Sequence, residues 1–93
     1  MKLLEVVELR TAAGTAAKVE EYLRDWVRQS GRAAVVARSY HHASLETDFS
    51  VHISYERNSD DTMPVTIGNQ LAGSLKDFGL VHRSVWVEQE FDG

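Results

Sequence analysis

The histidine at position 52 is the residue best placed for proton transfer, and its neighbours in the sequence are small and polar. The stretch from Phe49 to Tyr55 alternates apolar and polar side chains, with His52 on the polar side between Ser50 and Ser54. This alternation is typical of a strand with one apolar and one polar face. Because an imidazole can take up and release a proton near neutral pH, the strand could present a general base to a ligand.

The other histidines add a second candidate base but no metal site. His82 lies on a later strand candidate, whereas His41 and His42 are adjacent and point to opposite faces of a strand. In the four-stranded sheet that the hydrophobic pattern predicts, the usual strand spacing places His52 and His82 about 10 Å apart. That distance is too long for one zinc ion, and the chain has no cysteine. The sequence therefore predicts no metal site and no cofactor.

Three further residues could bind a ligand near these histidines. If the hairpin register places Arg38 beside His52, Arg38 could hold an anion and Tyr40 could donate a hydrogen bond. Trp86 could line an aromatic pocket or anchor an interface between two chains. A structural interpretation stays open, in which His52 bonds a neighbouring hydroxyl inside such an interface.

The composition is that of a globular chain forming one domain over residues 1–93. Hydrophobic residues make up 43% and charged residues 26% of the chain. The net charge of -4 and the pI near 5.5 argue against a nucleic-acid partner, which requires clustered Lys and Arg. Acidic residues interrupt the apolar run at the start, so neither a signal peptide nor a membrane span is expected. We expect a cytoplasmic protein with no membrane contact.

The hydrophobic pattern predicts four strands and two helices. A helical stripe runs from Ala16, with Thr15 as a hydroxyl cap and Gly31 as a left-handed stop. A weaker stripe begins between Thr62 and Thr66, continues to Phe78 and is stopped by Gly79. The predicted strands are Leu3–Arg10, Ala33–His42, Phe49–Tyr55 and Leu80–Glu90.

The order strand, helix, strand, strand, helix, strand predicts an α+β fold of the ferredoxin-like βαββαβ type. Right-handed crossovers place both helices on one face of a four-stranded antiparallel sheet, with Phe49–Tyr55 on an interior strand. The other face keeps apolar residues such as Leu4, Val6 and Trp86. We therefore expect a homodimer in which two helix-free faces meet and form a dimeric α/β barrel.

Several segments resemble the dimeric α/β-barrel superfamily, and most of all its antibiotic-biosynthesis-monooxygenase-type domains. These segments are the strand Leu4–Arg10, the turn Ala13–Thr15, the helix Val19–Leu23 and the strand Phe49–Glu56 with the following Arg57-Asn58-Ser59. The resemblance implies a small aromatic or polyketide-like ligand. Cofactor-free members and related haem-degrading enzymes often use an Asn on the first strand, a Trp, and a His on the second helix. This chain has no Asn in Leu3–Arg10 and no His between Thr62 and Phe78, which disfavours haem.

Two functions therefore remain open. The first is a small cofactor-independent monooxygenase-like enzyme, in which His52 or His82 moves a proton. The second is a non-catalytic module of the same fold that binds a ligand or supports assembly. A deep pocket holding a histidine would favour the first function. If Trp26, Leu75 and Phe78 instead fill the core, the non-catalytic module would be favoured.

Overall fold

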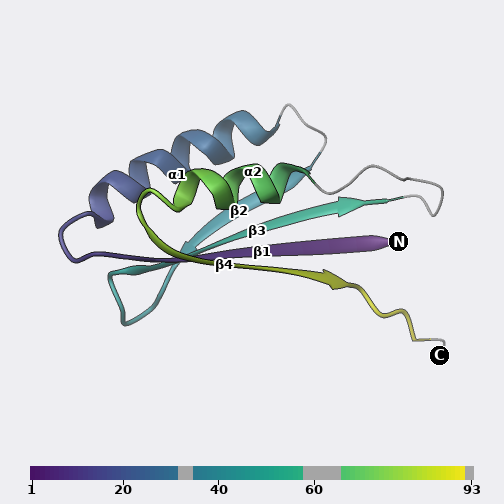
Figure 1. The fold of residues 1–93 in the computed structure, drawn as a ribbon. Coiled ribbons are helices and arrows are strands. Elements are labelled where there is room, and N and C mark those ends of the chain that lie inside the picture. Colours follow the sequence, from purple (N-terminus) through teal and green to yellow (C-terminus); the bar gives the residue numbers. More distant parts are fainter. Residues whose placement is uncertain (32–34, 58–65, 92–93) are drawn as a thin grey trace.

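The computed structural model describes residues 1–31, 35–57 and 66–91 and has the predicted βαββαβ order. Its strands are antiparallel neighbours in the order β2-β3-β1-β4, as expected. Both helices cover the same face of this sheet, and no helix of the described residues lies on the opposite face (Figure 1). The elements are β1 (Lys2–Thr11), α1 (Ala16–Ser30), β2 (Val36–His41), β3 (Asp48–Glu56), α2 (Thr66–Leu75) and β4 (Gly79–Val87).

The core lies between the sheet and the two helices. Alternate residues of the two interior strands β1 and β3 point toward the helices, because a strand turns successive side chains to opposite faces. They meet the apolar stripes of α1 and α2, while Trp26 and Phe78 pack at the margin. The largest fully buried apolar side chains are Val7, Val19, Leu23, Val51, Ile53, Leu71 and Leu75.

Two predicted strands are shorter in the structure than in the sequence pattern. The second strand begins at Val36, and Ala33, where the prediction began, lies outside the described residues. The last strand ends at Val87 and not at Glu90. Its partner in the described sheet is β1, which begins at Lys2, so the pairing ends with the hydrogen bond from Glu88 N–H to the Lys2 carbonyl. Both changes occur at the ends of edge strands and leave the order of the sheet unaltered.

Thr15 and Gly31 flank α1 as predicted, but neither caps the helix in the predicted way. Thr15 has helical dihedral angles and makes no side-chain cap; its hydroxyl donates to the Ala12 carbonyl at 2.6 Å. Gly31 is right-handed (φ -57°), so it is not a left-handed stop. Gly79 does not end α2 but begins β4, where a Cβ would collide with the Arg10 carbonyl. Neither helix in the described part of the chain is long and apolar enough to span a membrane.

Candidate functional site

The face of the sheet away from the helices, here called the open face, brings together all five predicted site residues. Strand pairing places their side chains in rows across the sheet, because residues opposite each other share a face. The open face carries Val36, Arg38 and Tyr40 from β2, Ser50, His52 and Ser54 from β3, Leu4, Val6 and Glu8 from β1, and Leu80, His82, Ser84 and Trp86 from β4.

His52 sits at the centre of one row. Arg38 lies directly opposite it on β2 and Val6 directly opposite on β1. The Tyr40 ring, diagonal to His52, has its centroid 4.6 Å from the imidazole with an interplanar angle of 47°. The hairpin therefore has the register on which the role of Arg38 was conditional, and His52 is fixed by strands on both sides. A cation, a phenol and an imidazole therefore converge beside a hollow of about 370 Å³.

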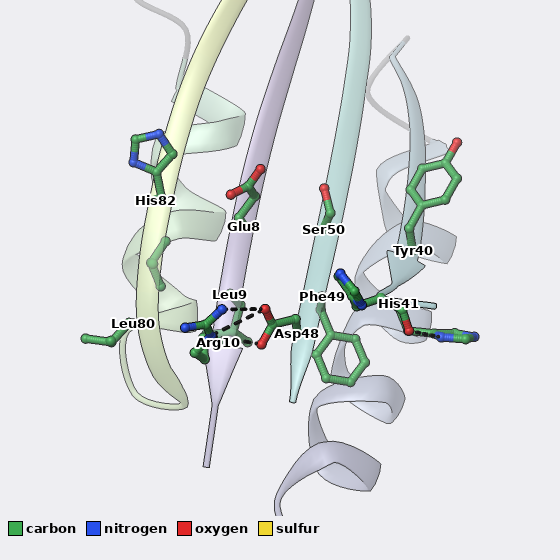
Figure 2. Close-up of a pocket in the computed structure, with 12 residues that line it drawn as sticks. Glu8, Leu9, Arg10, Tyr40, His41, Asp48, Phe49, Ser50, Leu80 and His82 are labelled. Atoms are coloured by element: carbon green, nitrogen blue, oxygen red, sulfur yellow. Dashed lines mark hydrogen bonds and ion pairs between the residues drawn. The ribbon is translucent and has the colours of Figure 1, made fainter. Parts of the chain in front are cut away.

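His82 belongs to the next row, away from His52. It lies opposite Glu8, which in turn lies opposite Ser50. Figure 2 shows these side chains projecting from neighbouring strands on one side of the sheet, with Tyr40 at the far end of the row. They line a hollow of about 420 Å³. His52 and His82 are on different rows with β1 between their strands, so the two rings do not form a pair.

An ion pair closes one end of this hollow. Arg10 Nε and Nη2 each donate to Asp48 at 3.0 Å (Figure 2). The hydrogen bond to Asp48 raises the pKa of Arg10, and the hydrogen bond from Arg10 lowers the pKa of Asp48. Arg10 is therefore occupied by its partner and does not present a free cation to the hollow.

The remaining predicted residues have simpler surroundings. Trp86 is 59% exposed on the open face, and its Nε1 donates to the Ser84 hydroxyl at 2.9 Å. The side chain of His41 shares the helix-facing side with Phe49. The His42 ring accepts backbone N–H groups from Ser44 and Leu45 at 3.0 Å, which orders the hairpin loop. Neither His41 nor His42 joins the rows of the open face.

Glu5 is the polar residue that sequence reasoning missed. Its side chain is fully buried on the helix-facing side of β1, where Arg83 Nε donates to its Oε1 at 2.9 Å. Gly68 of α2 lies directly over the carboxylate, and a Cβ there would overlap it. The sequence did contain a signal for this burial, because Glu5 occupies the same face of the strand as the apolar residues Leu3 and Val7. A charge at such a position requires a buried partner.

The second oxygen of Glu5 lies near another buried polar group. Within the described residues, Glu5 Oε2 and the Tyr55 hydroxyl have no hydrogen-bond partner. Burial raises the pKa of Tyr55, and the nearby Glu5 carboxylate raises it further, so the phenol stays protonated at neutral pH. A small rotation that lets Tyr55 donate to Glu5 would satisfy both groups. We interpret Glu5, Arg83 and Tyr55 as a structural cluster of the core.

Comparison with solved structures assigns the fold to a known class. A candidate antibiotic biosynthesis monooxygenase from Nitrosomonas europaea superimposes with a TM-score of 0.72 at 13% identity, covering 99% of this chain and 94% of its own. SnoaB, a cofactor-independent oxygenase from Streptomyces nogalater, gives 0.69 at 8% identity over 97% and 95%. Rv0793 from Mycobacterium tuberculosis gives 0.67 at 11% identity over the whole of both chains.

These likenesses confirm the predicted resemblance at the level of fold. The chain has the ferredoxin-like architecture of antibiotic-biosynthesis-monooxygenase-type proteins. No family model matches its sequence, and no curated protein matches it either. Identities this low establish the fold and not an activity.

Proposed function

We propose that the protein is a small, cofactor-independent monooxygenase-like enzyme that binds a small aromatic or polyketide-like molecule on the open face. The observation that carries the proposal is the position of His52. It lies on an interior strand, opposite Arg38 and with its ring centroid 4.6 Å from that of Tyr40, on the face away from α1 and α2. A rigid strand positions a general base better than a loop does.

The proposed chemistry assigns each group a role. His52 accepts a proton from an acidic C–H of the substrate, and Arg38 stabilises the negative charge that develops. Tyr40 donates a hydrogen bond, Trp86 bounds the aromatic ligand, and His82 is the second candidate for proton transfer. The substrate supplies the electrons: a CH₂ group and O₂ give a carbonyl and one water, which balances without any other reductant.

We also propose that two copies meet through their open faces. Val36 is 58%, Tyr40 46% and Trp86 59% exposed, so large apolar and aromatic side chains of this face have no cover in the single chain. A dimer with two-fold symmetry would cover the open face and would shield both hollows from solvent. The neighbours' fold class supports this arrangement. A cytoplasmic location is part of the same proposal, and cell fractionation would test it.

One observation favours the non-catalytic alternative. The space between the sheet and the helices is filled, because Leu23, Leu71 and Leu75 are at most 1% exposed and Trp26 and Phe78 pack against them. A ligand-binding or assembly module needs no deep pocket there. The enzyme proposal therefore depends on the open face alone.

Oxygen uptake by the protein after treatment with a chelator tests the proposed activity. We expect at least one reduced aromatic compound from a panel to be oxidised above its rate in buffer, with one O₂ consumed per product. The chelator removes adventitious metal, which keeps metal-catalysed autoxidation out of the comparison. If compounds bind but none consumes O₂, the non-catalytic alternative is correct.

A further inference from the structure

The imidazole of His42 holds the loop between β2 and β3, here called the hairpin loop (residues 42–47). Its Nδ1 accepts the backbone N–H groups of Ser44 and Leu45, each at 3.0 Å. Both donors belong to the same loop, so these hydrogen bonds do not depend on whether a second copy covers the open face. The hairpin loop is therefore closed by a titratable side chain of its own.

These two hydrogen bonds define the protonation state of the His42 ring. A backbone N–H group can only donate, so Nδ1 must carry a lone pair and no hydrogen. The neutral ring then has its hydrogen on Nε2. An imidazolium carries a hydrogen on both ring nitrogens and can accept neither N–H group. Uptake of one proton therefore removes both hydrogen bonds at once.

The neighbouring ring of His41 has the opposite arrangement. Its Nδ1 lies 3.1 Å from the His42 carbonyl oxygen, which can only accept a hydrogen bond. His41 Nδ1 therefore carries a hydrogen and donates it, and this bond survives when the His41 ring takes up a proton. Of these two adjacent histidines, only His42 couples its protonation to the conformation of the loop.

A protonated His42 has an acidic neighbour in Asp48. The hydrogen bond from Arg10 is the main cause of the lowered pKa of Asp48, and the charge of His42 adds to it. Asp48 therefore stays ionised throughout the range in which an imidazole titrates, and it attracts the charged ring. Glu46 is the other titratable residue of the hairpin loop. The remaining titratable or charged residues that line the hollow together with His42 are Glu8, Arg10, Tyr40, His41 and His82.

Backbone hydrogen bonds limit how far the hairpin loop can open. His42 N–H donates to the Asp48 carbonyl at 2.9 Å, and Thr11 N–H of β1 donates to the Thr47 carbonyl at 2.8 Å. These groups do not titrate, so both ends of the loop stay attached to the sheet. The middle of the loop is held more weakly: the Leu45 side chain is 46% exposed, and its carbonyl accepts from Asp48 N–H at 3.2 Å.

We propose that His42 is a pH-dependent latch of the hairpin loop: the neutral ring holds Ser44 and Leu45 in place, and the imidazolium releases them. The loop is closed above the range in which the ring titrates and opens as the pH falls through that range. Because His42 also lines the hollow of about 420 Å³, the same proton places a positive charge at this end of the hollow. The latch lies within the hairpin, so it stands whether or not the open face binds a substrate.

NMR of the whole chain at about pH 7.5 and about pH 5, which span most of the usual imidazole titration, tests the latch. At the higher pH, the ¹⁵N shifts of the His42 ring should show a hydrogen on Nε2 and none on Nδ1. The amide protons of Ser44 and Leu45 should shift with the same midpoint as the ring. Their protection from exchange, relative to an unstructured peptide at the same pH, should fall about 10-fold at the lower pH, because each loses its acceptor.

Two asparagine variants show whether His42 is responsible. In His42→Asn, the side-chain carbonyl can accept the same two N–H groups, as asparagine does in turns, but it does not titrate. The protection of Ser44 and Leu45 should therefore be the same at both pH values. His41→Asn is the matched control and should keep the wild-type response, because the His41 ring does not accept from the loop.

The ring measurement on the wild-type chain decides the proposal even if a variant is unstable. A hydrogen on His42 Nδ1 at the higher pH, equal protection at both pH values in the wild type, or the wild-type response in His42→Asn would each overturn it. Val51 of the interior strand β3 is the internal reference, and its amide should stay protected at both pH values. If Val51 loses protection together with Ser44 and Leu45, the whole sheet opens and the latch proposal is wrong.

Discussion

Replacing Arg83 with alanine should lower the free energy of unfolding by about 3 kcal/mol. Arg83 is the counterion of Glu5, whose carboxylate is fully buried between β1 and α2. Removing one partner of a buried ion pair typically costs about 3–5 kcal/mol, because an uncompensated charge remains in the core. We expect the lower end of that range because the Arg83 side chain is 25% exposed and water can partly replace it.

Chemical denaturation of three variants tests this value. Arg10→Ala is the matched control: it breaks an arginine–carboxylate pair on the surface, where Arg10 is 66% exposed, and should cost far less. The double variant Glu5→Leu/Arg83→Met should recover most of the loss, since apolar residues can replace a buried pair. If Arg83→Ala is no less stable than Arg10→Ala, the Glu5 charge does not depend on Arg83.

Replacing His52 with alanine should reduce turnover of an oxidised aromatic substrate by about 10²- to 10⁴-fold, the usual cost of losing a general base. The imidazole is held on an interior strand with Arg38 and Tyr40 beside it, so we expect a substrate bound against these two residues to depend on it. His82, the second candidate, lies on the strand beyond β1 and in another row, and we expect it not to compensate for the loss of His52.

Two controls distinguish loss of a base from loss of structure. His52→Ala should keep the thermal melting temperature of the wild-type protein and its mass in sedimentation equilibrium, because His52 is only partly buried. His42→Ala, which alters a ring engaged by the hairpin loop, should keep most of the turnover. Full activity in His52→Ala, or loss of activity only through unfolding, would make His52 a structural residue.

The fold could be predicted because hydrophobic alternation shows which face each strand buries. The apolar set of Phe49, Val51 and Ile53 required a covering layer on one side only, and two helical stripes supplied it. The ends of elements were harder to predict. Thr15 and Gly31 are suitable cap residues, but the dihedral angles they adopt depend on how the turns pack, which local sequence does not determine.

The candidate site could be predicted only in part, because a row across a sheet joins residues that are distant in sequence. Arg38 and His52 belong to one hairpin, so their pairing could be anticipated. Glu8 and His82 come from opposite ends of the chain, and their pairing depends on the register of β1 with β4. Glu5 was missed for a related reason: its partner Arg83 is 78 residues away.

Methyl NMR of the protein with 2-naphthol tests most directly whether the open face is the ligand-binding face. Leu80 and Val6 report on that face, whereas Leu71 and Leu75 report on the space between sheet and helices. We predict that the methyl signals of Leu80 and Val6 shift on titration while those of Leu71 and Leu75 stay in place. Shifts confined to Leu71 and Leu75 would place the ligand under the helices and contradict the proposed function.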